Sequence, residues 1–248
     1  MYCFFRSLAV GSVYLLLTTA CFPQAPSIPR HHAGIALFDG KDLSHFDIFL
    51  KDHGINSDPD HVFQVERGLI HVSGTEMGYI VTKEPYSNYY LRASFKWGEG
   101  TYGVRKDKAR DSGILFGVVG EPKVWPHSIE FQIQEGCTGD FWLTDGASLT
   151  DRQGHRVEAP PGKAIKVDRV DKAPFTDIVG FRPPDDLDKR HGEWNLVELV
   201  VQGTTVRQYV NGKLANEATD VSPQLGLILF QSEGAEIFFK DISLYPLK

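Results

Sequence analysis

Apolar residues recur at every second position through most of this chain, and this spacing limits the folds that it can adopt. Ile129, Phe131 and Ile133 alternate with polar residues, and residues 89–97 show the same alternation. A period of two is typical of a β-strand that buries one face. No segment combines a helical period of 3.6 with capping residues. The pattern therefore predicts an all-β protein, built as a sandwich or barrel of many short strands.

Turn-forming residues separate the predicted strands. Glu66-Arg67-Gly68 predicts a hairpin between two short apolar runs, and Asn211-Gly212 is the strongest hairpin signal in the chain. Glu233-Gly234 separates residues 225–231 from 237–244, which we expect to pair as a final hairpin. Residues 144–190 are rich in Pro, Gly, Asp and Lys, so we expect long loops with one or two strands beside the binding face.

The N-terminal residues have the character of an export signal. Arg6 precedes an apolar run over residues 8–17, which is too short to span a membrane. Small residues follow and end at Cys21, an arrangement that resembles a bacterial lipoprotein signal with the cysteine as the lipidation site. The alternative is simple cleavage near Ala25. Both routes predict an exported protein, periplasmic or at the cell surface, and the first adds a lipid anchor in the membrane.

These features predict three parts of the chain. Residues 1–21 form the signal peptide, residues 22–33 a proline-containing tether, and residues 34–248 a single domain. Cys137 is the only cysteine of that domain, so no disulfide can form within it. The formal net charge of −6 argues against nucleic acid as a partner, because phosphate binding requires a basic face.

The most informative segment is the run from Trp125 to Gly136. Its apolar residues occupy one face of a strand, so Glu130 and Gln132 share the other face with Gln134. Such residues are also common on ordinary solvent-facing strands. The flanking Trp125 and Trp142 favour a cleft in which sugar rings stack, and a bulge could turn Glu135 toward the same cleft.

The same spacing resembles the Glu-x-Asp-x-x-Glu signature of laminarinase-type glucanases. Gln132 stands at the position of the middle Asp, which argues against a conventional double-displacement glycosidase.

Six short motifs in the same order resemble the 3-keto-disaccharide hydrolase family over nearly the whole predicted domain. The resemblance implies a concanavalin A-like jelly-roll β-sandwich with a polar concave cleft and long loops beside it. The motifs are Leu37-Phe38-Asp39-Gly40-Lys41-Asp42-Leu43, Asp111-Ser112-Gly113-Ile114, Ile129-Glu130-Phe131-Gln132, Gly192-Glu193-Trp194-Asn195, Val210-Asn211-Gly212, and Gln231-Ser232-Glu233-Gly234 with Phe239-Lys240-Asp241-Ile242.

For an enzyme of this family, the resemblance implies cleavage of 3-keto sugars by removal of the C2 proton, elimination and hydration. We expect Glu130 to act as the base and Glu135 as the acid. The residues expected to bind an oligosaccharide or glycoside substrate are Asp111, Trp125, His127, Gln132, Trp142, Gln231 and Glu233.

Two other functions stay open from the sequence. One is a carbohydrate-binding lipoprotein without catalytic activity, and the other is a conventional glycoside hydrolase. We expect no cofactor and assign no metal site, although carboxylates with His127 or His155 could bind a divalent cation.

Overall fold

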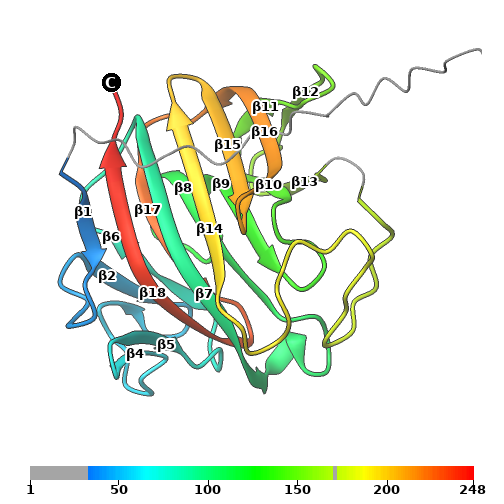
Figure 1. Cartoon of the computed structure of the whole chain (residues 1–248). Coiled ribbons are helices and arrows are strands. Elements are labelled where there is room, and N and C mark those ends of the chain that lie inside the picture. Colours follow the sequence, from blue (N-terminus) through cyan, green and yellow to red (C-terminus); the bar gives the residue numbers. More distant parts are fainter. Residues whose placement is uncertain (1–32, 170–171) are drawn as a thin grey trace, which may run out of the picture.

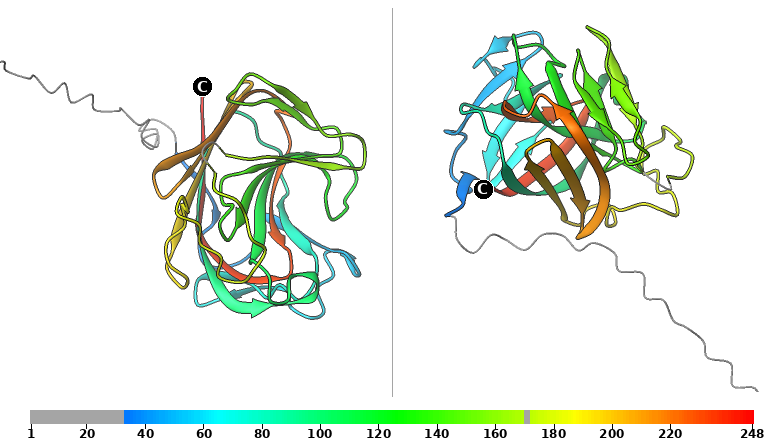
Figure 2. Two further views of the ribbon diagram at one scale, coloured as in Figure 1. Left: turned by 90° about the vertical axis from the view of Figure 1, so that its right-hand side faces the viewer. Right: turned by 90° about the horizontal axis from the view of Figure 1, so that it is seen from above.

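The computed structural model describes residues 33–169 and 172–248 and contains two antiparallel β-sheets stacked as layers (Figures 1 and 2). The prediction of a jelly-roll-type β-sandwich is confirmed. The expected signal peptide, tether and lipidation site at Cys21 lie outside the described residues. Among the described residues, no helix is long and apolar enough to cross a membrane.

The larger sheet has ten strands. In spatial order they are β12 (Arg156–Glu158), β11 (Ser148–Thr150), β16 (Lys213–Ser222), β15 (Thr205–Val210), β14 (Asn195–Gln202), β7 (Tyr89–Thr101), β18 (Ala235–Pro246), β5 (Leu69–Val72) and β4 (Phe63–Glu66), and β1 (Ile35–Phe38) also pairs with β18.

The smaller sheet has eight strands and carries the candidate site. Their order is β13 (Ala164–Val167), β10 (Phe141–Thr144), β9 (His127–Gln134), β8 (Asp111–Val119), β17 (Leu227–Ser232), β6 (Gly78–Thr82), β2 (Phe46–Leu50) and β3 (Gly54–Ile55). A short 3₁₀ helix, η1 (Gly103–Arg105), follows β7 and leads toward β8.

The core lies between the two sheets, where the alternating apolar residues meet. Ile129, Phe131 and Ile133 of β9 are fully buried there, together with Phe95 of β7 and Phe239 of β18. Burial of such side chains stabilises the fold by about 1.5–3 kcal/mol each. The neighbouring polar residues of β9 consequently point to the outer face of the smaller sheet.

Two of the predicted hairpins are confirmed. β4 pairs with β5 across Arg67 and Gly68, and β15 pairs with β16 across Asn211 and Gly212. All four turn residues have positive φ, which is the conformation that a two-residue hairpin turn of type I′ requires.

The predicted final hairpin is wrong. β17 pairs with β6 and β8 in the smaller sheet, whereas β18 pairs with β7, β5 and β1 in the larger one. Glu233 and Gly234 therefore carry the chain from one layer to the other. The short sequence signal marks a change of direction but does not specify which sheet the next strand joins.

The segment predicted as long loops contains β11, β12 and β13, one short strand more than expected, followed by residues 172–194 without strands. It lies beside the candidate site, because Thr144 and Ala164 line the cavity described below.

Candidate active site

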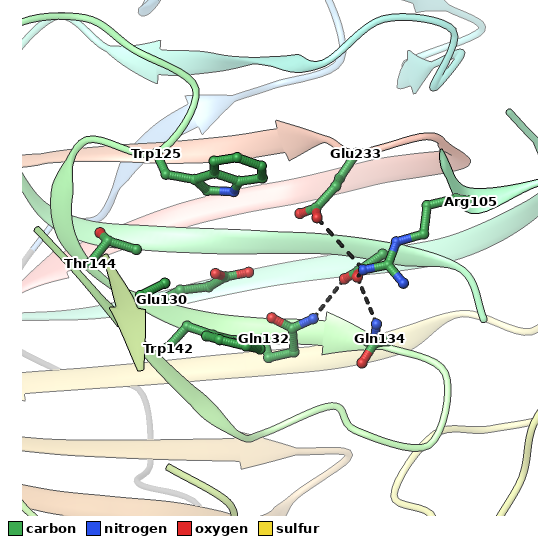
Figure 3. Close-up of a pocket in the computed structure, with 10 residues that line it drawn as sticks. Arg105, Trp125, Glu130, Gln132, Gln134, Trp142, Thr144 and Glu233 are labelled. Carbon is green, nitrogen blue, oxygen red and sulfur yellow. Dashed lines mark hydrogen bonds and ion pairs between the residues drawn. The ribbon is translucent and has the colours of Figure 1, made fainter. Parts of the chain in front are cut away.

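A cavity of about 240 Å³ opens on the outer face of the eight-stranded sheet. Figure 3 shows its floor formed by side chains of β8, β9 and β10, with Trp125, Glu233 and Arg105 around them. The residues that line it are Arg105, Asp111, Trp125, Glu130, Gln132, Gln134, Trp142, Thr144, Ala164 and Glu233.

The alternation of β9 places three polar side chains on this face. Glu130 is 4% exposed, Gln132 3% and Gln134 6%, so the surrounding walls cover them almost as completely as the core covers their apolar neighbours. Burying polar groups is unfavourable unless they form hydrogen bonds. The hydrogen-bond partners of these three side chains therefore indicate which groups the cavity can bind.

Asp111 of β8 is the centre of a hydrogen-bond network. Gln132 donates from Nε2 to Oδ1 at 2.6 Å, Gln134 donates from Nε2 to Oδ2 at 2.6 Å, and Arg105 forms an ion pair with the same carboxylate. An ionised carboxylate can only accept hydrogen bonds, so each amide turns its nitrogen toward Asp111. The amide oxygen of Gln132 is thereby left facing the interior of the cavity (Figure 3).

Glu130 and Gln231 meet above Gly113. The Oε1 atoms of both side chains are buried and have no hydrogen-bond partner among the described residues. A Cβ atom on Gly113 would lie 2.2 Å from Oε1 of Glu130 and 2.6 Å from Oε1 of Gln231. The absence of a side chain at position 113 is therefore what allows the Glu130 carboxyl to occupy its place at the cavity floor.

The cavity contains the carboxyl groups of Asp111, Glu130 and Glu233 and a single guanidinium, that of Arg105. Burial raises the pKa of Glu130 well above its ordinary value, and the negative charges of Glu233 and Asp111 raise it further, while Arg105 opposes the shift. Burial and the charge of Glu233 also raise the pKa of Asp111, again opposed by Arg105.

Glu233 is the carboxyl on the opposite side of the cavity. Burial raises its pKa as well, and the nearby Arg105, at 3.7 Å, opposes the change. Because Arg105 forms ion pairs with both Asp111 and Glu233, it stabilises their ionised forms more directly than that of Glu130. Glu130 is therefore the carboxyl of this cavity whose ionised form Arg105 stabilises least directly, and it is the one best placed to accept a proton.

The expectation that Glu135 is the acid does not fit its position. Its carboxylate accepts a hydrogen bond from Nη1 of Arg110 at 2.8 Å, and the backbone amides of Arg110 and Gly180 donate to its other oxygen at 2.9 and 2.8 Å. Both oxygens are thus occupied, and the side chain does not line the cavity. Glu135 instead fixes the loop around Gly180 to the end of β9.

The other residues expected to bind substrate divide into two groups. Trp125, Trp142 and Glu233 line the cavity, and Asp111 and Gln132 are joined by the hydrogen bond at its floor. His127 and Gln231 do not line it. The ring of His127 packs near Gly146, and Gln231 lies next to Glu130.

The sequence did not indicate Arg105, Thr144 or Ala164. Thr144 ends β10 beside Trp125, and Ala164 begins β13 from the predicted loop region. Arg105 belongs to η1 and is brought to Asp111 only by the folding of the β7–β8 connection. No short motif surrounds it, so no local signal could have identified it.

Within the described part of the chain, no group of three or more His, Cys, Asp or Glu residues is arranged to hold a metal ion. Cys137 is buried and forms no disulfide with another described residue.

The model of the family described as the 3-keto-alpha-glucoside-1,2-lyase-like domain matches residues 34–245. The chain belongs to this family. The name describes cleavage of a glucoside, so the chain is a member of a carbohydrate-active, glycosidase-like family. The family suggested by the six sequence motifs is thereby confirmed. No curated protein matches the chain.

Solved structures resemble the chain at low sequence identity. Two proteins of Parabacteroides distasonis ATCC 8503, each described as a candidate glycosyl hydrolase, are 19% and 20% identical, with TM-scores of 0.55 and 0.53. Each comparison covers 87% of this chain, with 94% and 100% of the other chain. A structure from work on endo-acting O-glycanases of the human gut microbiota has 11% identity and a TM-score of 0.52, covering 84% of this chain and 94% of its own. At sequence identities this low, these comparisons support only the fold of this member of the 3-keto-alpha-glucoside-1,2-lyase-like family.

Proposed function

We propose that the chain cleaves glycosidic bonds of 3-keto sugars by elimination, followed by hydration of the product. The observation that carries the proposal is Glu130, a buried carboxyl with a raised pKa and an unpartnered oxygen at the floor of a cavity. A general base is most effective when its pKa lies near the working pH, and burial moves Glu130 in that direction. Membership of the 3-keto-alpha-glucoside-1,2-lyase-like family supports the same chemistry.

The ketone makes the reaction accessible to a carboxylate base. With a carbonyl at C3, the charge left by removal of the C2 proton delocalises onto the C3 oxygen as an enolate. Glu130 takes the C2 proton, the C1–O bond breaks, and the electron pair of the enolate forms the C1–C2 double bond. Arg105 supplies positive charge within the cavity for the developing enolate.

Glu130 also returns its proton to the departing oxygen. The carboxyl that the sequence suggested for this step, Glu135, does not line the cavity. Glu233 and Asp111 are ion-paired with Arg105 and act through their negative charge, which raises the pKa of Glu130. One carboxyl therefore serves as base and then as acid, and water adds across the double bond afterwards.

The cavity walls suit a sugar ring. Trp125 and Trp142 offer aromatic faces for its apolar side, and the Gln132 amide oxygen accepts hydrogen bonds from its hydroxyl groups. The cavity volume is below the ~300–1,000 Å³ of pockets for drug-sized ligands, which is appropriate for a small substrate.

The test compares a 3-keto disaccharide with its unoxidised parent, with deuterium at C2 and products followed by mass spectrometry. We expect cleavage of the ketone substrate alone, with replacement of the C2 deuterium by solvent hydrogen. Glu130→Gln should lose about 10²–10⁴-fold in kcat and still bind sugar, because only the proton-transfer function is removed. Glu158→Gln, an exposed change on edge strand β12, is the matched control.

The other outcomes identify other functions. Retention of deuterium at C2 during cleavage would exclude elimination, and cleavage of the unoxidised parent would indicate a conventional glycoside hydrolase. Binding of both sugars without any cleavage would show that the protein is a carbohydrate-binding protein.

We also propose that the protein is exported and anchored in a membrane through a lipid on Cys21. The proposal is supported by Arg6, the short apolar run after it and the small residues before the cysteine. Such an anchor places the cavity outside the cytoplasm.

A further inference from the structure

A second cavity of about 290 Å³ adjoins the candidate active site. The two cavities share Trp125, Thr144 and Ala164, so they lie side by side on the outer face of the smaller sheet. Trp125 is 48% exposed at the junction, although a large indole is normally more buried. One aromatic side chain is thus available to substrate groups in both cavities.

Three separate chain segments build the second cavity. Lys123 and Trp125 come from the β8–β9 connection, Asp145 follows β10, and Lys163 precedes β13. The backbone amide of Asp145 donates to the Lys163 carbonyl at 2.8 Å, and its side-chain Oδ1 accepts from the Gly162 amide at 2.7 Å. These bonds hold the last two segments together, so the lining is preformed.

The charges of the two cavities are opposite. The first contains three carboxyl groups and one guanidinium, whereas the second contains two ammonium groups and one carboxylate. That carboxylate, Asp145, is already paired with Lys123 and with the Gly162 amide. Among the described residues, Lys163 is exposed and has no ion-pair partner, so it is the lining cation of the second cavity that is not already paired with a carboxylate.

We propose that the second cavity binds the leaving-group half of the glycoside and favours a leaving group with an acidic substituent, such as a sugar carboxylate, which pairs with Lys163. This inference rests on the proposed function, because the ring that loses its C2 proton must lie beside Glu130 in the first cavity. The bond to be cleaved then lies near Trp125. A negative substituent is repelled by the carboxyl groups around Glu130 and attracted toward Lys163, so charge also fixes the direction of the substrate.

The test uses two matched 3-keto disaccharides that differ only in the leaving sugar, glucose in one and glucuronic acid in the other. An exposed ion pair contributes modestly, so we expect kcat/KM to favour the acidic substrate about two- to fivefold, mainly through KM. The preference should decrease at high salt because the pair is solvent-accessible. Lys163→Gln should bring the ratio of the two substrates close to one, and the exposed Lys213→Gln of β16 should leave the ratio unchanged.

A binding measurement separates failure of this inference from failure of the proposed reaction. Titration of methyl glucuronide and methyl glucoside, followed by NMR, requires no turnover. Tighter binding of the glucuronide that is lost in Lys163→Gln supports the acidic subsite even if no bond is cleaved. Equal binding of both sugars, or a preference that persists in Lys163→Gln, overturns it.

Discussion

Substitution of Gly113 by alanine tests whether the position of Glu130 determines activity. The added Cβ would lie 2.2 Å from Oε1 of Glu130, whereas ordinary contacts begin at 3.4 Å, so the carboxyl must move by about 1.2 Å, the difference between the two distances. The Oε1 atom of Gln231, at 2.6 Å, restricts the space into which it can move. A displacement of about 1 Å of a reacting group can cost on the order of 10²-fold in rate.

The effect on stability should be small by comparison. Gly113 does not have a positive φ, so alanine is compatible with its backbone and reduces the freedom of the unfolded chain by about 0.4–1 kcal/mol. The atoms that the new Cβ meets are the ends of flexible side chains. We therefore expect kcat/KM on a 3-keto disaccharide to fall roughly 10²-fold, with the free energy of unfolding changed by about 1 kcal/mol or less.

Gly98→Ala of β7 is a matched control. Its added Cβ would meet the carboxylate of Glu236 at 2.3 Å, a clash of the same kind, but Glu236 does not line the cavity. This variant should keep its activity while folded. If Gly113→Ala is folded, by circular dichroism and thermal unfolding, and keeps kcat/KM within threefold of the original, the position assigned to Glu130 in the reaction is wrong.

Four further expectations follow from the same structure. The low-pH limb of kcat/KM should lie above the ordinary pKa of a glutamate, because Glu130 must be ionised to act and its pKa is raised; a limb near 4.5 would contradict this. Phe131→Ala should reduce the free energy of unfolding by about 3–5 kcal/mol in denaturant titrations, because the ring is fully buried. Glu135→Gln should reduce it by about 3–5 kcal/mol by leaving Arg110 unpaired, and unchanged stability with lost turnover would restore Glu135 as the acid. Cys21→Ser should release the protein from membranes in cell fractionation, and unchanged fractionation would exclude the lipid anchor.

The layered fold was predictable because its signals are local. Alternation in β9 assigns Ile129 and Phe131 to the core and Glu130 to the other face, whatever strands lie beside it. The Asn211-Gly212 turn is equally local, because its backbone conformation depends on two residues. The pairing of β17 with β8 instead of β18 depends on which sheet completes the core, and no short segment contains that information.

The candidate site was predictable where it follows one strand and unpredictable where distant segments meet. The position of Glu130 and Gln132 in the cavity was predictable because they share a face of β9. Glu135 was expected in the cavity and does not line it, because it pairs with Arg110, which precedes the neighbouring strand β8 and lies 25 positions earlier in the chain. Arg105 was missed for the same reason, since its relation to Glu233 exists only after both sheets have formed.

The change of sheet at Glu233 and Gly234 links the chemistry to the stacking of the two layers. Glu130 and Asp111 are carried by the smaller sheet, whereas Arg105 follows the end of β7 in the larger sheet. The Tyr102 amide, three residues before Arg105, donates to the Gly234 carbonyl at 2.7 Å and joins the two segments. The charged groups of the cavity thus come from both halves of the sandwich and are joined at a seam. A small slide of one layer over the other would separate Arg105 from Asp111 and Glu130 while leaving every strand intact, so activity requires the correct register of the two sheets as well as the sheets themselves.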